Sequence, residues 1–327
     1  MPAEWEPHAA TWLTWPKPNG ISFPGRYKEI PPILAKLVKL ISEGEEVHIN
    51  IWDKELELLA KRSLEKENVL MKKVHFHSFQ AYEPWCRDHG PMFVVQPNGN
   101  QAIVNWGYNA WGGKYPPFDL DNSIPSKVAE ALGIPLIEPE MILEGGSIDV
   151  NGNQSLITTE QCMLNTNRNP NLDKQEIESR LSGFMGVKNI TWLGNGIKGD
   201  DTDGHVDNIS RFVSKNTVVT AVEENISDPN HEILQYNRNV LKKKFNIIEL
   251  PMPRKIEYQG QRLPASYANF YICNSHIIVP TYRDTNDDRA IETLKDMFPK
   301  RKVTGLDSIE LIWGLGSFHC LTQQQPA

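Results

Sequence analysis

The chain has 327 residues, of which 39% are hydrophobic and 23% are charged, and its net charge is −7. This composition favours a soluble globular protein, because no apolar run is long enough to span a membrane. The acidic balance provides no basic surface of the kind that binds nucleic acid.

The first residues carry no targeting signal. Residues 1–5 contain neither a basic leader nor an apolar run followed by small residues, so we expect a cytoplasmic protein. The four cysteines show no C-x-x-C spacing, which argues against a disulfide framework and against a cysteine zinc site. We therefore expect reduced thiols.

Helical and β-type patterns alternate along the chain. Apolar residues at spacings of three and four predict helices at 33–41, 177–184, 231–245 and 289–298. Asn-Gly turns between β-rich runs predict hairpins around 98–99 and 151–152. Further strands are expected after helices, at 247–250 and 303–306. The alternation predicts an α/β fold.

A short pattern of polar or small residues before an apolar stretch occurs five times. Its marker residues lie 50 to 64 positions apart and are Asp88, Glu144, His205, Asn269 and His319. Regular self-similarity of this kind favours five related strand–helix modules over two domains, so we expect one domain over residues 1–327. If the modules close around a pseudo-fivefold axis, their starting points meet at the centre, where we expect the functional site.

Cys320 is the candidate nucleophile. It follows the glycine-rich stretch 313–316, and glycines let backbone approach a ligand closely. The alternative interpretation is a small buried hydrophobic residue, which is common for a free cysteine.

Alignment of the module starts places Cys320 with Asp88, Glu144, His205 and Asp207. The set has a nucleophile, a proton-transfer group and three carboxylates, with no Lys or Arg needed to neutralise them. A negative cluster suits a delocalised cation, and two carboxylates can bind a guanidinium through paired hydrogen bonds. The sequence therefore predicts a site for a guanidine compound.

Individual roles follow from local patterns. Trp85, three residues before Asp88, is expected to form an aromatic wall for a cation with an aliphatic stem. On a strand His205 and Asp207 would face the same side, and Glu144 would help to keep His205 protonated. His319 is left out of the site, because adjacent side chains on a strand point to opposite faces.

Each of these residues also has a plainer interpretation. Asp88 could form a surface ion pair with Arg87, His205 could be a hydrogen-bonded structural histidine, and Glu144 could be a polar turn residue. Asp201 and Asp203 are assigned to a loop. A His, Asp and Cys set could also hold a transition metal, although the close histidine spacing of zinc enzymes is missing.

Taken together, these motifs resemble the agmatine deiminases of the guanidine-modifying superfamily. The likeness spans the whole chain and includes residues 1–8, Trp-x-Arg-Asp-x-Gly-Pro at 85–91, Glu-Gly-Gly at 144–146, Thr-Asp-Gly-His-Val-Asp-Asn at 202–208 and His-Cys-Leu-Thr-Gln-Gln at 319–324. One departure is Ser317-Phe318, where the family usually has Asn-Ile before His-Cys, and we expect a small effect on loop geometry. Residues 109–115 look like a family loop near the site.

The resemblance implies a five-bladed, pseudo-symmetric α/β propeller of the pentein type. It also implies hydrolytic deimination of agmatine to N-carbamoylputrescine and ammonia, within polyamine and putrescine biosynthesis. Asp88 and Asp207 would hold the guanidinium over Cys320 and His205 would transfer protons, through an amidino-cysteine intermediate and with no cofactor or metal.

The expected partner is a small cationic guanidine, with no nucleic acid or membrane, and we also expect a homodimer. Two alternatives stay open. The chain could be an arginine or peptidylarginine deiminase on the same scaffold, with Arg87 meeting a substrate carboxylate. It could also be a catalytically silent propeller that only binds.

Overall fold

Strands and helices alternate along the chain in the computed structural model, which describes residues 1–327. Four sheets have three strands each, with the first two antiparallel and the third parallel to the second. Their strands are β4 (Met92–Val95), β5 (Gln101–Val104) and β6 (Leu136–Ile137); β7 (Ile148–Val150), β8 (Ser155–Thr159) and β9 (Asn189–Leu193); β10 (Ser210–Ser214), β11 (Thr217–Val222) and β12 (Asn246–Pro251); and β15 (Tyr271–Ile272), β16 (His276–Thr281) and β17 (Lys302–Asp307).

The fifth large sheet follows the same rule with strands from both ends of the chain. Strand β18 (Thr322–Pro326) is antiparallel to β1 (His8–Thr14), and β2 (Glu46–Asn50) is parallel to β1. A fourth strand, β3 (Val74–His77), extends this sheet in parallel to β2. A separate small hairpin consists of β13 (Glu257–Tyr258) and β14 (Gln261–Arg262).

One longer helix connects the second and third strands of each sheet, as a parallel crossover requires. These helices are α1 (Ile30–Ser42), α6 (Ile124–Leu132), α8 (Lys174–Met185), α9 (Asn230–Leu241) and α10 (Asp287–Met297), and α2 (Lys54–Lys66) leads from β2 to β3. Six short helical turns lie in the connections: α4 (Ala110–Gly113), α5 (Asp119–Asn122), α7 (Glu160–Met163), η1 (Tyr27–Glu29), η2 (Met71–Lys73) and η6 (Leu311–Gly314).

Local sequence explains where these helices begin and which face they bury. In α1 two prolines occupy the first turn, where no backbone N–H is needed, and the apolar face of Leu34, Leu37, Val38 and Ile41 is buried. Helix α8 begins at a capping box of Asp173 and Glu176. The predicted helices are confirmed as α1, α8, α9 and α10, and the two predicted hairpins as β4–β5 and β7–β8.

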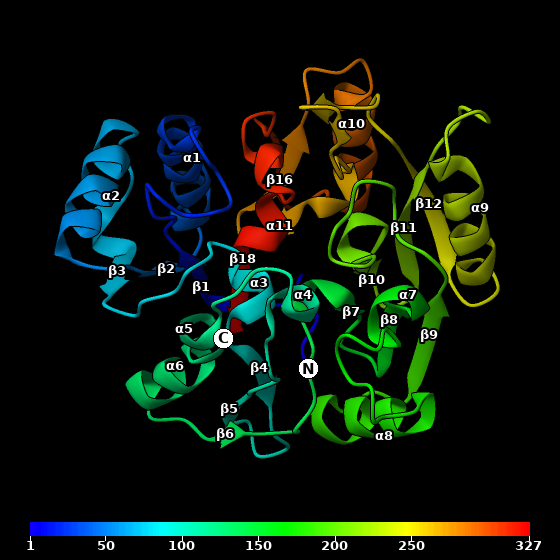
Figure 1. Cartoon of the computed structure of the whole chain (residues 1–327), viewed down its shortest axis with the longest axis horizontal. Helices are drawn as coiled ribbons and strands as arrows, with labels where there is room; N and C mark the ends of the chain where they lie inside the picture. Colours follow the sequence, from blue (N-terminus) through cyan, green and yellow to red (C-terminus); the bar gives the residue numbers. More distant parts are fainter.

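A one-turn helix precedes the first strand of each sheet and carries or follows a marker residue. These turns are α3 (Cys86–His89), η3 (Gly145–Ser147), η4 (Val206–Asn208), η5 (Tyr267–Asn269) and α11 (Phe318–Leu321). Each turn contacts the next in this order, and α11 contacts α3. Figure 1 shows α3, α11 and β18 near the middle of the view, with α1, α2, α6, α8, α9 and α10 towards the outside.

The mixed α/β fold is therefore confirmed, whereas two local predictions are wrong. Asp207 belongs to the helical turn η4, which His205 directly precedes, and His319 and Cys320 belong to the helical turn α11, so neither pair lies on a strand. The rule that neighbouring side chains point to opposite faces holds for strands and does not apply here. The directions of these side chains follow from their tertiary contacts. None of the helices has the length and hydrophobicity needed to cross a membrane.

Candidate active site

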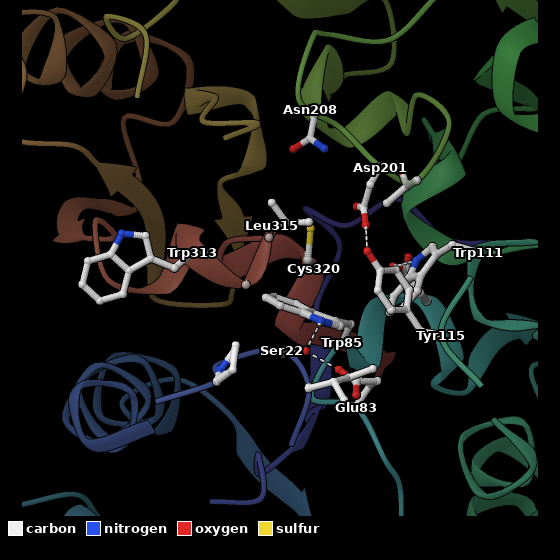
Figure 2. A pocket seen from close by; sticks show the side chains of 16 residues that line it. Ser22, Glu83, Trp85, Trp111, Tyr115, Asp201, Asn208, Trp313, Leu315 and Cys320 are labelled. Atoms are coloured by element: carbon white, nitrogen blue, oxygen red, sulfur yellow. Dashed lines mark hydrogen bonds between the residues drawn. The ribbon is translucent and has the colours of Figure 1, made fainter. Parts of the chain in front are cut away.

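A cavity opens next to the ring of one-turn helices, and Cys320 lies on its wall (Figure 2). Its lining holds three acidic residues, Glu83, Asp88 and Asp201, and no lysine, arginine or histidine. The other lining residues are Ile21, Ser22, Pro24, Trp85, Trp111, Tyr115, Thr202, Asn208, Trp313, Gly314, Leu315 and Gly316. The charge of this lining selects for a positively charged ligand.

The nucleophile candidate lies on α11 and is 7% exposed. The Asn269 side-chain amide donates to Cys320 Sγ at 3.1 Å, and Asp207 Oδ2 lies 3.6 Å from the same sulfur. Burial, and then the charges of Asp207 and Asp88, raise the pKa of the Cys320 thiol well above its ordinary value. In the empty site the group is therefore a thiol, and a bound cation would favour the thiolate.

The glycines before Cys320 allow close packing on an aromatic wall. A Cβ on Gly314 would lie 2.9 Å from a ring carbon of Trp85, and one on Gly316 would overlap the same indole. Trp85 is buried, lines the cavity and donates from Nε1 to Ser22 Oγ at 2.9 Å. Trp85 and Cys320 therefore lie side by side in the lining of the cavity (Figure 2).

Asp88, on α3, is held by two donors. Trp111 Nε1 donates to Oδ2 at 3.0 Å, and the backbone N–H of Gly146 donates to Oδ1 at 3.0 Å. Burial raises the pKa of the Asp88 carboxyl, and His205, with Nδ1 3.7 Å from Oδ1, partly offsets that rise. The surface ion pair with Arg87 does not form, because Arg87 is buried and pairs with Glu4 instead.

His205 precedes η4 and is buried between Asp88 and Glu144. Its Nε2 lies 4.0 Å from Glu144 Oε2 and has no hydrogen-bond partner. Burial lowers the pKa of His205, but the charge of Asp88 and the neighbouring Cys162 and Glu144 outweigh it, so that the pKa lies well above the ordinary value. Gly146 is required here, because a Cβ would lie 2.5 Å from His205 Nδ1.

Glu144 has a basic partner, contrary to the expectation that no arginine neutralises the carboxylates. Arg168 Nε donates to Glu144 Oε1 at 3.0 Å, and its Nη1 pairs with Asp203. Both Arg168 and Glu144 are buried, and an unpaired carboxylate there would be costly. Asp203, expected only as a loop residue, therefore forms an ion pair with the arginine that binds Glu144.

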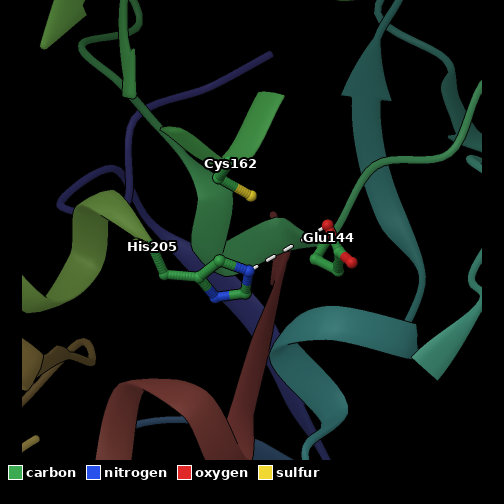
Figure 3. A group of neighbouring side chains, drawn as sticks. All are labelled: Glu144, Cys162 and His205. Carbon is green, nitrogen blue, oxygen red and sulfur yellow. Dashed lines mark ion pairs between the residues drawn. The ribbon is translucent and has the colours of Figure 1, made fainter. Parts of the chain in front are cut away.

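Glu144, Cys162 and His205 also form a group of metal-ligand types, with donor atoms within 4.8 Å of one another (Figure 3). The Arg168 guanidinium already binds the Glu144 carboxylate. A fixed positive charge next to the group disfavours a second cation there, because like charges repel.

The structure brings all the predicted residues together, although only some of them line the cavity. Trp85, Asp88 and Cys320 line it, while Glu144, His205 and Asp207 lie buried behind them. Other site residues were missed by sequence reasoning: Asn208, Trp111, Tyr115, Asp201, Asn269 and His319. Asn269 and His319 carried a signal as module markers, Asn208 as part of the motif at 202–208, and Trp111 and Tyr115 as part of the loop at 109–115.

His319 requires a correction, because its exclusion rested on a strand. On the helical turn α11 its Nδ1 lies 2.7 Å from Asp207 Oδ2, and its Nε2 lies 2.9 Å from Glu4 Oε2. Asp201, assigned only to a loop, lines the cavity and accepts a 2.5 Å hydrogen bond from Tyr115. Glu83 also lines the cavity, and burial raises its pKa to about 7.

Known proteins resemble the chain over its whole length. The family model of the Porphyromonas-type peptidyl-arginine deiminases matches residues 1–326. An agmatine deiminase from Pseudomonas syringae pv. tomato is 35% identical over 358 residues, which cover 100% of this chain and 95% of that protein.

Two solved structures have the same fold as the chain. A cysteine-to-serine variant of the agmatine deiminase from C. jejuni, with substrate bound, is 34% identical with a TM-score of 0.93 and covers 100% of this chain and 96% of its own. The agmatine deiminase of Enterococcus faecalis is 30% identical with a TM-score of 0.92, over 100% of this chain and 95% of that one.

Proposed function

The chain belongs to the Porphyromonas-type peptidyl-arginine deiminase family, and we propose that it is an agmatine deiminase, a hydrolase that converts agmatine to N-carbamoylputrescine and ammonia. The observation that carries this proposal is Cys320 beside two buried carboxylates, in a cavity whose lining has three acids and no base. Such a cavity suits a substrate with a positive charge at each end.

Asp88 and Asp207 bind the guanidinium in this proposal. Both Asp88 oxygens are oriented by donors, and Asp207 Oδ1 is buried without a hydrogen-bond partner, so it can accept from the substrate. Two carboxylates fix a planar guanidinium bidentately and place its carbon over Cys320 Sγ. The distance of 3.6 Å from Asp207 to the sulfur supports this placement.

Deimination then proceeds through a covalent intermediate. The bound cation favours loss of the thiol proton, and the Cys320 sulfur attacks the guanidinium carbon. His205, protonated by its acidic surroundings, donates a proton to the nitrogen that leaves as ammonia. Water then adds to the amidino carbon and His205 takes up one of its protons. The C–S bond breaks as the second water proton passes to the sulfur, which releases the ureido product and restores the Cys320 thiol, while the proton that the thiol first lost leaves with the ammonia as ammonium.

The acidic lining of the cavity favours agmatine over arginine. Agmatine ends in an ammonium, which Glu83 and Asp201 can bind, whereas arginine also carries an α-carboxylate that these acids repel. Arg87, the candidate partner for such a carboxylate, pairs with Glu4 and does not line the cavity. Arginine and peptidylarginine deimination are therefore the weaker alternatives, and a silent binding module would have no need of the buried Cys320 site.

We also propose that the five sheets are blades of a single catalytic α/β propeller that spans residues 1–327. Support comes from the shared strand order of the sheets and from the contacts that run from α3 through η3, η4 and η5 to α11 and back to α3. A cytoplasmic location suits the four free cysteines. The homodimer stays a prediction, which sedimentation equilibrium of the purified chain tests.

The proposed activity is tested by formation of ureido product from agmatine, free arginine and an arginyl peptide. Wild-type protein should convert agmatine in preference to the other two, and Cys320→Ala should abolish conversion. Cys273→Ala is a matched control, because that buried cysteine bonds to the His276 carbonyl, does not line the cavity and should not abolish turnover. Preference for arginine or for the peptide would refute the substrate assignment, and no reaction with any of them would refute the activity.

A further inference from the structure

His319 connects the turn that carries the nucleophile to two carboxylates. Its ring nitrogens lie 2.7 Å from Asp207 Oδ2 and 2.9 Å from Glu4 Oε2. The same oxygen of Asp207 is the one that lies 3.6 Å from Cys320 Sγ. One oxygen of the Asp207 carboxylate is thus fixed beside the sulfur, and the other, Oδ1, is left without a hydrogen-bond partner.

Both ring nitrogens of His319 face a carboxylate oxygen, and only an imidazolium has an N–H to donate to each. A neutral imidazole has only one N–H, so its other nitrogen would turn a lone pair towards a carboxylate oxygen. Burial raises the pKa of Asp207, but the hydrogen bond and charge of His319 outweigh burial and keep it below the ordinary value. The pKa of Glu4 is likewise held well below its usual range. Both acids are ionised, and His319 donates to each.

Glu4 is itself anchored by strong partners. Arg211 Nη2 lies 2.8 Å from Oε1, Arg87 Nη2 lies 3.1 Å from Oε2, and the backbone N–H of Ile272 donates to Oε1 at 2.9 Å. Arg211 also pairs with Asp149, at 3.1 Å. The buried cluster behind the site therefore balances three acids against three bases: Glu4, Asp149 and Asp207 against Arg87, Arg211 and His319.

The charge balance of this buried cluster keeps the Asp207 carboxylate ionised. A carboxylate this deeply buried stays ionised only if cations and donors compensate its desolvation. His319 supplies that compensation from the side opposite the substrate, so the free oxygen of Asp207 keeps its charge for the guanidinium. The groups that face Asp207 are His319 and Cys320 on α11, His205 before η4, Asp88 on α3 and Arg211 on β10.

We propose that His319 is a positioning residue for the reaction, and that Glu4 acts through it to orient the Asp207 carboxylate. This inference rests on the proposed deimination. His319 touches neither the cavity lining nor the reacting carbon, and its effect passes through Asp207 to the substrate and to Cys320 Sγ. The segment before β1, which supplies Glu4, thereby contributes to the site from behind.

The test is His319→Gln, which keeps a donor but has no charge, assayed for kcat and KM with agmatine between pH 6 and 9. A misplaced binding group costs about 100-fold, so kcat/KM should fall by about that factor. The acid limb of the pH profile should also move to higher pH, because a buried Asp207 without its cation takes up a proton more readily. A substitution that only destabilised the fold would not move the acid limb of the pH profile.

Glu4→Gln is the second variant. It retains the size of the side chain and one acceptor, so its kinetics can be measured even if His319→Gln fails to fold. The substitution removes the charge that faces His319, Arg87 and Arg211, and loss of the charged contact to His319 should lower kcat/KM about 10-fold. If Glu4 acts through His319, the double variant should be no worse than His319→Gln alone. His276→Gln is the matched control, a buried histidine 3.5 Å from Glu43 that does not line the cavity, which should keep wild-type kinetics.

Unchanged kcat/KM and pH profile in His319→Gln, or full additivity with Glu4→Gln, would overturn the proposal. A readout independent of turnover separates this outcome from failure of the proposed function. Alkylation of Cys320 by 2-chloroacetamidine, a cationic amidine, requires a charged Asp207 but no deimination. If wild-type protein fails to convert agmatine, the deiminase assignment fails, while slower alkylation in His319→Gln than in His276→Gln would still support positioning.

Discussion

Replacement of Trp111 by phenylalanine should weaken substrate binding by an amount that follows from one hydrogen bond. Trp111 Nε1 donates to Asp88 Oδ2 at 3.0 Å, and both side chains are buried. A hydrogen bond to a charged group contributes about 1.5–3 kcal/mol, which corresponds to about 10- to 150-fold in an equilibrium constant. Because Asp88 holds the guanidinium in the ground state and the transition state alike, most of the loss should appear in KM.

The assay is release of ureido product from agmatine over a range of substrate concentrations. Trp106→Phe is the matched control, because Trp106 is equally buried but its indole N–H has no hydrogen-bond partner. Both variants lose the same atoms, so a general packing defect would affect both. An unchanged KM in Trp111→Phe, or the same rise in Trp106→Phe, would refute the role of this hydrogen bond.

Three further changes test other charges in the molecule. Burial raises the pKa of Glu83 to about 7, so KM for agmatine should fall between pH 6 and 8 as this acid ionises, and Glu83→Gln should remove that trend. Arg168→Met leaves the buried Glu144 unpaired and should lower the free energy of unfolding by about 3–5 kcal/mol; a change below about 1 kcal/mol in urea titrations would contradict this. Burial and the neighbouring His77 lower the pKa of His48 to about 3, so the unfolded chain binds protons below pH 6.5 that the folded chain excludes. Stability should therefore decline from pH 6.5 towards pH 3, and His48→Phe should show a smaller decline in thermal unfolding.

The repeat and the elements around it could be predicted from the sequence because their signals are local. Asn-Gly at 98–99 specifies a hairpin turn by itself, and the apolar spacing at 33–41 specifies one face of α1. Asp88, Glu144, His205 and the marker before η5 precede their strands at similar spacings, so their convergence followed from the period. The way in which the sheets are arranged around the site depends on contacts between modules, which no single module encodes.

The missed residues depend on tertiary contacts or on turns too short to show periodicity. The turn that carries His319 and Cys320 has four residues, less than is needed to tell a helix from a strand by apolar spacing. Trp111 reaches Asp88 through a left-handed backbone, with φ of 55°, which a non-glycine residue adopts only when surrounding packing fixes it. Arg168 has no local motif, and the matching segment 1–8 gives no sign of a role for Glu4, because the significance of both residues lies in the buried charges that they meet.

The pairing of β1 with β18 governs when during folding the nucleophile reaches its place. Trp12 on β1 bonds to Gln325 on β18, 313 positions further along the chain, and β18 follows directly after the turn with Cys320. Closing so long a loop is slower than forming a hairpin or a helix. Before it closes, Cys320 is not held beside Asn269. During refolding, catalytic competence should therefore return later than most of the secondary structure, and a chain whose residues 322–326 are still inside the ribosome has no assembled catalytic centre.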